Sequence, residues 1–429
     1  MTTAESVKEG GKVVRVAGTV LHVVGIHARV GDLCRLWPPG ADEATFGEVV
    51  GFDGERTVVT PIGSLLGVSP LTRVEAMGHG LRVPHGRDLL GRVVDGFCRP
   101  LDGGPEIGRR VREVRGDVAS PLSRPPIDQP FRTGVRAIDG MLPLGVGQRV
   151  GVFAGAGAGK TTLIGAITAR AEVDAVVIGL IGERGREVSE FLSDAIAPSL
   201  RDRSVVVVST SDRPAAERIG AAHTASAIAE SLRDDGRHVL LVVDSLTRFA
   251  RALREVGLAA GEPPVRRGFP PGVFAELPRL IERAGRTGLG AISALYTVLV
   301  EGPEGSDPVS EEVRSLLDGH IVMTTELADA GHFPAIDVLS SRSRVVSRVC
   351  SAAHLRRVND VRGLMSLYRE SELLIRLGEY RPGSDAALDR AVRMHDAIDA
   401  FLRQDLSDVH PTEREDAAAM LETLLGREA

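Results

Sequence analysis

The residues best suited to chemistry lie in a glycine-rich run that ends in one lysine and two threonines. The run comprises Gly155, Ala156, Gly157, Ala158, Gly159, Lys160, Thr161 and Thr162. Glycines allow a short loop to turn several backbone N–H groups toward one anion, and the start of a following helix adds partial positive charge. Residues 149–153 predict a strand before the run, and residues 163–170 predict a helix after it. This order predicts a loop that binds nucleotide phosphates.

The lysine in this loop is unusual for the chain. Lys160 is one of only three lysines, with Lys8 and Lys12, among 52 Lys and Arg residues. Arg supplies positive charge almost everywhere else, so Lys160 stands where a compact ammonium is needed rather than a planar fork. In such loops the lysine reaches the β- and γ-phosphates, and the next hydroxyl, here that of Thr161, ligates Mg²⁺. The loop opens with Ala154 where the motif has Gly, at a position that only has to be small.

Two carboxylates follow predicted strands near this loop. Asp244 comes after the apolar run 239–243, and Glu183 comes shortly after the run 175–181. A carboxylate at the carboxyl end of a strand beside the loop can hold Mg²⁺ or its water, which is the role predicted for Asp244. Glu183 is predicted to polarise the attacking water. A solvated charge cluster is the alternative for Glu183, because other charged residues follow it directly.

Two arginines later in the chain are candidates for completing the site. Arg342 and Arg344 follow a short extended run, and either could be a finger that reaches the γ-phosphate held by a neighbouring subunit. An ordinary surface arginine is the alternative. A guanine-specific site would need an Asn-Lys-x-Asp loop, and none of the three lysines lies in such a setting. The sequence therefore favours adenine as the base.

Three regions with different patterns are expected to position these residues. Residues 1–88 contain short β-branched runs separated by Gly, Asp and Pro, which predict a small β-barrel for subunit contacts rather than ligand binding. Residues 89–346 alternate strand-like and helix-like stretches, which predict an α/β domain with a parallel sheet covered on both faces. Residues 347–429 show only amphipathic helix patterns. Residues 91–117 have the composition of a linker.

Apolar runs define the strands expected in the central sheet: 149–153, 175–181, 204–209, 238–243, 291–296 and 320–323. The stretch 213–234 predicts a long helix between two of them. In the last region the expected helices are 355–377, 385–406 and 411–425.

Composition excludes several classes of protein. A net charge of −6 and an aromatic content of 3% argue against a general nucleic-acid binder, which needs basic and stacking surfaces. No apolar window of about 18 residues occurs, and residues 1–11 lack the apolar core of a signal peptide. Cys34, Cys98 and Cys350 are isolated and show neither zinc nor redox spacing, so packed thiols in a reducing compartment are expected. A cytoplasmic location is predicted.

Taken together, the motifs resemble those of the hexameric ATPases of type III protein secretion, of injectisome and flagellar kinds, which are relatives of the catalytic subunit of rotary ATP synthase. The resemblance extends from about residue 15 to 405 and rests on the order and spacing of segments 133–139, 153–161, 182–187, 257–264, 267–271, 296–301, 312–321 and 332–337. It implies an N-terminal barrel, a central RecA-like P-loop NTPase domain and a C-terminal helical domain. It further implies a homohexamer with ATP and Mg²⁺ bound between subunits.

The resemblance also implies a role for individual residues. Lys160 and Thr161 bind phosphate and Mg²⁺, Glu183 activates water, and Asp244 is the carboxylate on the metal side. Arg184 and Arg248 steady Glu183 and the γ-phosphate. Arg344 is implied as the arginine finger that one subunit supplies to the site of its neighbour. Phe333, where the family usually has Tyr, stacks on adenine.

In the family, ATP hydrolysis releases chaperones from secreted proteins, unfolds them and promotes their export at the inner-membrane base of the apparatus. The implied partners are a stator protein, a central stalk protein, export-gate membrane proteins and chaperone–effector complexes, without nucleic acid. Residues 1–12 are short and polar, which leaves stator contact open, and the loop 302–308 differs from the common acidic version. Segments 312–318 and 336–339 favour the injectisome branch.

Other functions remain as alternatives. A flagellar export ATPase is the nearest of them. A non-catalytic nucleotide-binding subunit would tend to carry Gln where this chain has Glu183. A Rho-like RNA translocase would need aromatic and basic strands near the N-terminus, and a rotary synthase subunit would need an acidic contact motif after Arg369.

Overall fold

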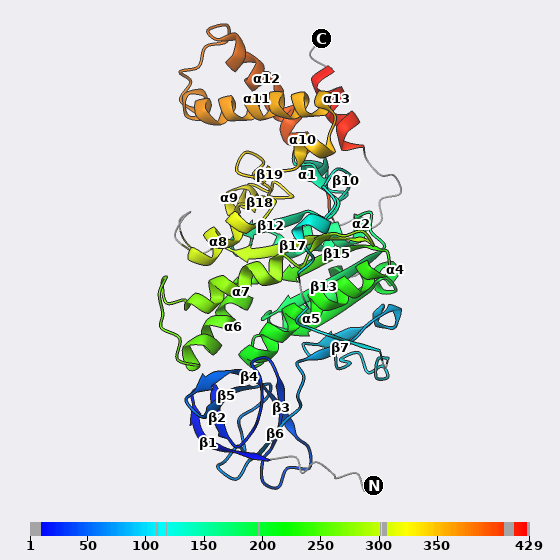
Figure 1. The fold of residues 1–429 in the computed structure, drawn as a ribbon. Helices are drawn as coiled ribbons and strands as arrows, with labels where there is room; N and C mark the ends of the chain where they lie inside the picture. Colours follow the sequence, from blue (N-terminus) through cyan, green and yellow to red (C-terminus); the bar gives the residue numbers. More distant parts are fainter. Residues whose placement is uncertain are drawn as a thin grey trace.

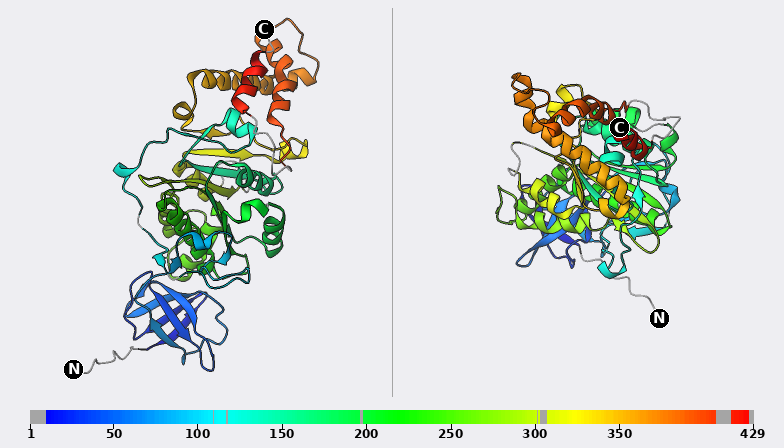
Figure 2. Two further views of the ribbon diagram at one scale, coloured as in Figure 1. Left: turned by 90° about the vertical axis from the view of Figure 1, so that its right-hand side faces the viewer. Right: turned by 90° about the horizontal axis from the view of Figure 1, so that it is seen from above.

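The computed structural model describes residues 10–108, 110–116, 118–195, 198–300, 302, 307–406 and 416–426. Three regions follow one another along the long axis of the molecule, with a β-barrel at one end, an α/β region in the middle and helices at the other end (Figure 1). Two further views show the same arrangement (Figure 2). The extension 1–9 and most of the loop 302–308 fall outside the described residues.

The N-terminal region is a closed six-stranded barrel with strand order β1-β2-β5-β4-β3-β6. Its strands are β1 Gly11–Ala17, β2 Val20–Val24, β3 Leu33–Trp37, β4 Thr45–Asp53, β5 Arg56–Pro61 and β6 Arg73–Ala76. Alternate side chains such as Leu21, Val23 and Leu36 point inward and are fully buried. Closure pairs every strand edge, so this small region needs no cover from other elements.

The middle region is built on one large, mostly parallel sheet, whose main path runs β19-β18-β12-β17-β15-β13-β14-β8. The strands are β8 Val93–Asp95, β12 Arg149–Ala154, β13 Ala175–Ile181, β14 Ser204–Ser209, β15 His238–Asp244, β17 Ala291–Leu299, β18 Gly319–Met323 and β19 Arg342–Ser343. The six predicted strands of this sheet are therefore confirmed. Only β19 and the short β16 Gly285–Arg286 pair antiparallel with their neighbours.

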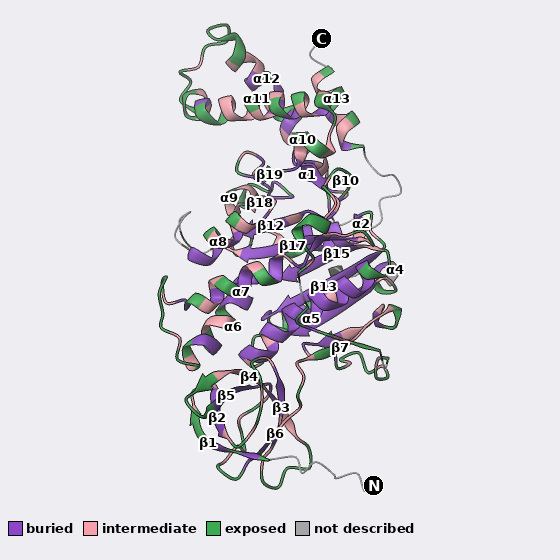
Figure 3. Cartoon of the chain, in the orientation of Figure 1, coloured by how far each residue is buried: buried purple, intermediate pink, exposed green. Residues whose placement is uncertain are grey.

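Helices cover both faces of the sheet, as the buried character of its strands requires. Along β13, Val176, Ile178 and Leu180 pack in one core with α2 Lys160–Arg170, whereas Val177 and Ile181 pack in a second core on the opposite face. The helices of the second core are α5 Ala215–Asp234, α6 Leu246–Ala259, α7 Pro271–Ile281 and α8 Pro308–Leu316. Figure 3 shows the buried sheet, the buried helix α5 against it, and exposed residues on α6, α7 and α8. The predicted fold, a RecA-like α/β domain between a barrel and helices, is confirmed.

The last region consists of helices, and the three longest of them share the first core with α1 Arg136–Met141. These helices are α10 Val346–Val349, α11 Ala352–Arg376, α12 Ala386–Leu402 and α13 Ala417–Gly426. Val361, Met394 and Phe401 belong to the same core as Ile138 of α1. Of the helix predicted over 411–425, residues 411–415 lie outside the described ranges. Among the helices that the structure describes, none has the length and apolarity of a membrane span.

The stretch 91–117, expected to be a linker, is instead part of the folded α/β region. It supplies β8, which pairs parallel with β14, and β9 Val111–Glu113, which pairs with β7 Arg82–Pro84. Arg115 then ties the barrel to this region, because its guanidinium lies 2.9 Å from Glu48 of β4 and 3.5 Å from Glu276 of α7. The remaining short elements are α3 Gly185–Glu190, α4 Pro198–Arg201, α9 Thr325–Asp329, β10 Pro130–Phe131 and β11 Leu144–Gly145.

Candidate active site

The predicted phosphate loop connects the carboxyl end of β12 to the start of α2. Gly157 and Gly159 have φ values of 85° and 82°, a left-handed conformation that side-chain-bearing residues rarely adopt. A Cβ atom added at Gly157 would meet nothing within 4 Å, so the loop has open space above it. The helical hydrogen bonds of α2 begin with Leu163 N–H donating to Gly159 O, which leaves the earlier N–H groups of the helix for an anion.

Lys160 joins the loop to the two carboxylates predicted from the sequence. Its Nζ lies 2.5 Å from Asp244 Oδ1 and 3.7 Å from Glu183 Oε1. Asp244 ends β15 and is only 4% exposed. The hydroxyl of Thr297, on the adjacent β17, donates to the same Asp244 oxygen at 2.6 Å. Thr161 and Thr162 are exposed next to this group. The donor set of a lysine, a hydroxyl and a buried carboxylate suits a nucleotide with Mg²⁺.

Glu183 is held from the other side by Arg248 of α6. The guanidinium donates to both carboxylate oxygens, with Nε 3.2 Å from Oε1 and Nη2 3.1 Å from Oε2. Burial raises the pKa of Glu183 to about 7, helped by a hydrogen bond with Glu187 and the charge of Asp244 and opposed by Lys160 and Arg248. The same hydrogen bond lowers the pKa of Glu187. A carboxyl that titrates near neutral pH is suited to general-base work.

The sequence motifs did not reveal every member of this cluster. Thr297 lies inside a buried strand, where Thr is ordinary, and Glu187 stands in a run of charged residues that shows no catalytic pattern by itself. Arg184 takes a different place from Arg248. Its side chain is 74% exposed and lies 3.8 Å from Glu187, and among the described contacts it has none with Glu183. The structure thus brings Lys160, Asp244, Glu183 and Arg248 together, with Arg184 at the rim.

Phe333 lies beside the end of the phosphate loop. Its ring is 49% exposed, which is unusual for a Phe, and a Cβ added at Gly159 would lie 3.8 Å from it. The backbone here is anchored to the helical region, because Gln404 N–H donates to Phe333 O at 2.9 Å and His332 Nδ1 lies 2.8 Å from Asp399. A fixed aromatic face next to a phosphate loop is suited to stacking on a base.

We expect Phe333→Ala to weaken ATP binding about tenfold, because stacking of a base on an aromatic ring contributes roughly 1–3 kcal/mol. Phe333→Tyr keeps the ring and is the matched control, with binding close to that of the unmodified chain. Titration with a fluorescent ATP analogue measures both. Equal affinity of the Ala variant and the unmodified chain would contradict this placement of the base.

Arg344 lies away from the phosphate loop of its own chain. Its N–H donates to Asp318 O at 2.9 Å, next to the amino end of β18, whereas the loop follows the carboxyl end of β12. The offset from Asp318 to Met323, which lies opposite Ala154, is five residues, or about 16 Å along the sheet. The side chain is exposed at the edge strand β19.

Comparison with known proteins identifies the family. Residues 134–343 match the ATP synthase alpha/beta family, nucleotide-binding domain, residues 13–78 match the beta-barrel domain of the same family, and residues 350–423 match the T3SS EscN ATPase C-terminal domain. The type 3 secretion system ATPase of Xanthomonas euvesicatoria is 50% identical over 395 residues, 92% of this chain and 89% of that protein. The flagellum-specific ATP synthase of Bacillus subtilis is 44% identical over 427 residues, 99% and 97% of the two chains.

Two solved structures are similar to this chain over nearly its whole length. The assembled ATPase EscN from the type III secretion system of enteropathogenic E. coli superposes with a TM-score of 0.91 at 44% identity, over 97% of this chain and all of that chain. EscN in complex with its central stalk EscO gives 0.87 at 43% identity, over 98% and 100%. The chain is therefore an ATP-hydrolysing enzyme of the ATP synthase alpha/beta family and belongs, within it, to the type 3 secretion system ATPases.

Proposed function

We propose that this enzyme uses Mg²⁺-dependent ATP hydrolysis, in a homohexameric ring, to release chaperones from secreted proteins, unfold them and promote their export. The observation that carries the catalytic part is the cluster at the carboxyl ends of β12, β13 and β15. There Lys160 Nζ lies 2.5 Å from Asp244 Oδ1 and 3.7 Å from Glu183 Oε1. The Lys160 ammonium lies between two carboxylates, so it can leave one of them to bind phosphate.

The roles of the residues follow from this arrangement. Lys160 turns from Asp244 to the β- and γ-phosphates, and the backbone N–H groups of residues 155–161 hold the phosphate tail. Thr161 and Asp244 would hold Mg²⁺, and Thr297 fixes the Asp244 oxygen. The ion would supply positive charge that stabilises the transition state. The loop and the carboxyl end of β15 therefore both contribute to stabilising the negative charge of the phosphates.

Glu183 accepts the proton of the attacking water as general base. Arg248 fixes its orientation through the bidentate contact, so the carboxylate stays aligned when Lys160 moves away. Glu187 carries the negative charge of the Glu183–Glu187 pair while Glu183 is protonated. Arg184, at the rim, is placed to steady the γ-phosphate once a second copy closes the site. Arg344 of that copy supplies the finger.

The assembly part of the proposal draws on the EscN structures, described as assembled and as bound to a central stalk. We infer a homohexamer with sites between copies and a central stalk protein as partner. A stator protein, export-gate membrane proteins and chaperone–effector complexes are the further partners, at the inner-membrane base of the apparatus on the cytoplasmic side, without nucleic acid. A flagellar export ATPase is the second candidate, supported by the Bacillus subtilis relative. The match of residues 350–423 to the EscN C-terminal domain favours the injectisome.

Export by a strain that lacks the gene for this chain tests the proposal. The unmodified chain should restore export, and Lys160→Ala should lower it at least about 100-fold, because the loop loses its only ammonium at the developing charge. Arg356→Gln, an exposed arginine of α11 outside the cluster, is the control and should restore export. Export of the substrates with Lys160→Ala at the level of the unmodified chain would exclude an ATP-driven role. Separate scoring of effector secretion and motility distinguishes injectisome from flagellum.

A further inference from the structure

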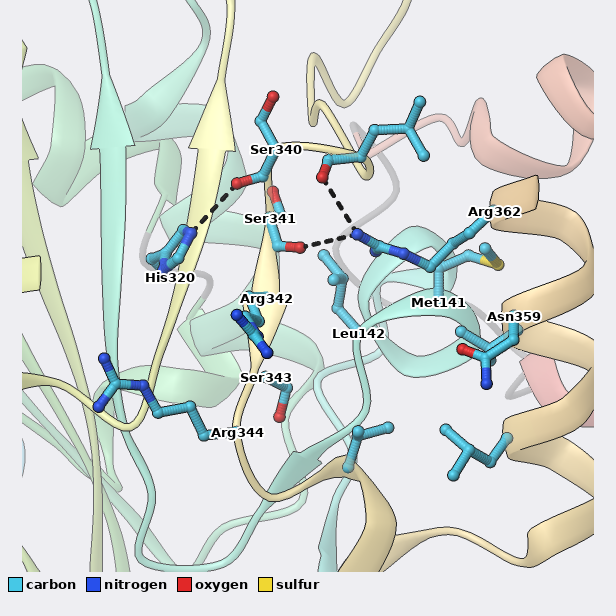
Figure 4. A pocket seen from close by; sticks show the side chains of 14 residues that line it. Met141, Leu142, His320, Ser340, Ser341, Arg342, Ser343, Arg344, Asn359 and Arg362 are labelled. Carbon is cyan, nitrogen blue, oxygen red and sulfur yellow. Dashed lines mark hydrogen bonds between the residues drawn. The ribbon is translucent and has the colours of Figure 1, made fainter. Parts of the chain in front are cut away.

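A cavity of about 680 Å³ lies between the edge strand β19 and helix α11, outside the nucleotide cluster of the same chain. Figure 4 shows its two walls: Arg342, Arg344 and His320 belong to the strand side, and Asn359 and Arg362 belong to the helix side. The cavity therefore bridges the α/β region and the helical region. None of the motifs singled out for the hydrolysis reaction accounts for the helix side of this space.

The lining has an excess of positive charge. Of the 14 described residues that line the cavity, three are arginines and none is acidic. Arg342 lies in β19, and Arg344 directly follows this strand. Both are exposed, and within the described ranges neither forms an ion pair. The positive charge of these guanidinium groups is therefore available to an anion.

Two carboxylates on segments that adjoin β18 and β19, Asp337 and Asp318, are already engaged. Asp337 pairs with Arg369 at 2.8 Å and accepts a hydrogen bond from the Ser340 hydroxyl at 2.7 Å. Asp318 pairs with Arg149 at 2.9 Å. Neither carboxylate is free to neutralise Arg342 or Arg344.

The wall that carries these arginines is preformed. Arg362 of α11 donates to the carbonyl oxygens of Val338, Leu339 and Ser341 at 2.7, 3.1 and 3.3 Å, which fixes the segment that leads into β19. His320 Nε2 lies 3.1 Å from Ser340 O on the same wall. Burial, followed by the charges of Arg314, Arg344 and Arg342, lowers the pKa of His320. The imidazole is thus a neutral donor, and the positive field comes from the arginines.

We propose that this cavity is an oxyanion site for a phosphoryl group, with Arg342 as its principal ligand and the Asn359 amide as a second donor. A guanidinium presents two parallel N–H groups that match phosphate oxygens, and Arg342 lines the cavity on its strand side. Building on the proposed function, we assign the source as the phosphate cleaved on a neighbouring copy, whose site Arg344 faces. Bound phosphate then links β19 to α11, so that its release changes the contact between the two regions.

Phosphate binding to the full chain tests this assignment. The protein is saturated with Mg²⁺ and a non-hydrolysable ATP analogue, which fills the β- and γ-phosphate positions of the loop, and inorganic phosphate is titrated by calorimetry. The unmodified chain should bind one phosphate per chain, and Arg342→Gln should bind it about tenfold more weakly, as loss of a charge-assisted bidentate contact implies. Arg342→Lys keeps the positive charge but loses the two parallel N–H donors of the guanidinium. Its affinity for phosphate should lie between those of the unmodified chain and Arg342→Gln. Arg356→Gln, on α11 outside the cavity, should match the unmodified chain.

Three outcomes would overturn the site: no phosphate binding by the unmodified chain, equal affinity of Arg342→Gln, or an equal loss in Arg356→Gln. Stopped-flow measurement with a fluorescent phosphate sensor separates the two sources. A changed rate of phosphate release in Arg342→Gln supports cleaved phosphate as the ligand, and an unchanged rate together with the weaker titration supports phosphate from solution. The titration involves no hydrolysis, so its failure leaves the export test of the proposed function unaffected.

Discussion

Glu183→Gln is expected to lower ATP turnover by roughly 10²–10⁴-fold, the usual contribution of a positioned general base, while the variant still binds ATP. Gln has nearly the same shape and keeps one oxygen for Arg248, which contacts both carboxylate oxygens in the native chain. Lys160 loses only its weaker partner at 3.7 Å and keeps Asp244 at 2.5 Å. Single-turnover hydrolysis and equilibrium binding of a nucleotide analogue measure the two properties separately.

The control for this variant is Glu190→Gln, at the end of α3, the short helix that begins two residues after Glu183. Glu190 is exposed and pairs only with Arg186, at 3.4 Å, so its removal should leave turnover within about twofold. Turnover by Glu183→Gln at the rate of the unmodified chain would exclude Glu183 as the base. A loss of nucleotide binding as large as the loss of turnover would instead assign Glu183 to holding the site together.

The pH profile gives a second readout of the same carboxyl. Its pKa is raised from 4.5 to about 7, so the base form is populated above about pH 7 and single-turnover hydrolysis should rise with pH through that value. Stability has the opposite sign, because between pH 4.5 and about 7 the folded chain holds a proton that the unfolded chain releases. The contribution of Glu183 to stability is complete below pH 4.5 and lost as pH rises through about 7. Above pH 7, Glu183→Gln should therefore unfold at a higher temperature than the unmodified chain.

The central sheet could be predicted because its strands are buried on both faces. Such strands are continuous apolar, β-branched runs, and β13 and β14 are buried along their whole length. Of the strands in this sheet that were not predicted, β8 has only three residues between Gly and Pro-rich sequence, and its partner β14 lies more than 100 residues later. Nothing local marks so short a strand. Its formation depends on the edge that β14 offers.

Some residues of the candidate site could likewise be predicted from the sequence, and others could not. Lys160, Asp244 and Glu183 stand at motif positions, where a strand ends and a polar residue begins, so spacing alone predicted their meeting. Arg248 entered through the family resemblance, and the contact with Glu183 depends on how α6 lies across the carboxyl end of β13. Thr297 is one polar residue in a buried strand, and only the register of β17 beside β15 places its hydroxyl on Asp244.

A mixture of two inactive variants is expected to recover ATP hydrolysis if the site is shared between copies. Lys160→Ala removes the phosphate ligand, and Arg344→Ala removes the finger, whose loss in related phosphate transfers costs about 10³–10⁵-fold. Each variant alone should therefore be nearly silent. In rings assembled from equal amounts of both, a working site needs an intact Lys160 in one copy and an intact Arg344 in the next. Random assembly gives about one quarter of the sites this combination, so the mixture should recover about a quarter of the activity.

The geometry is the reason for expecting recovery between chains rather than within one. Arg344 donates its N–H to Asp318 O, at the end of the sheet opposite to the loop, and directly follows β19, which forms the outer edge. The matched control mixes Lys160→Ala with the double variant that carries both Lys160→Ala and Arg344→Ala. This mixture contains no chain with an intact Lys160 and should show no ATP hydrolysis. If the mixture of single variants is as silent as this control while rings still assemble, Arg344 acts on nothing outside its own chain. In that case each chain hydrolyses ATP alone, and the position of Arg344 at the sheet edge has no part in the reaction.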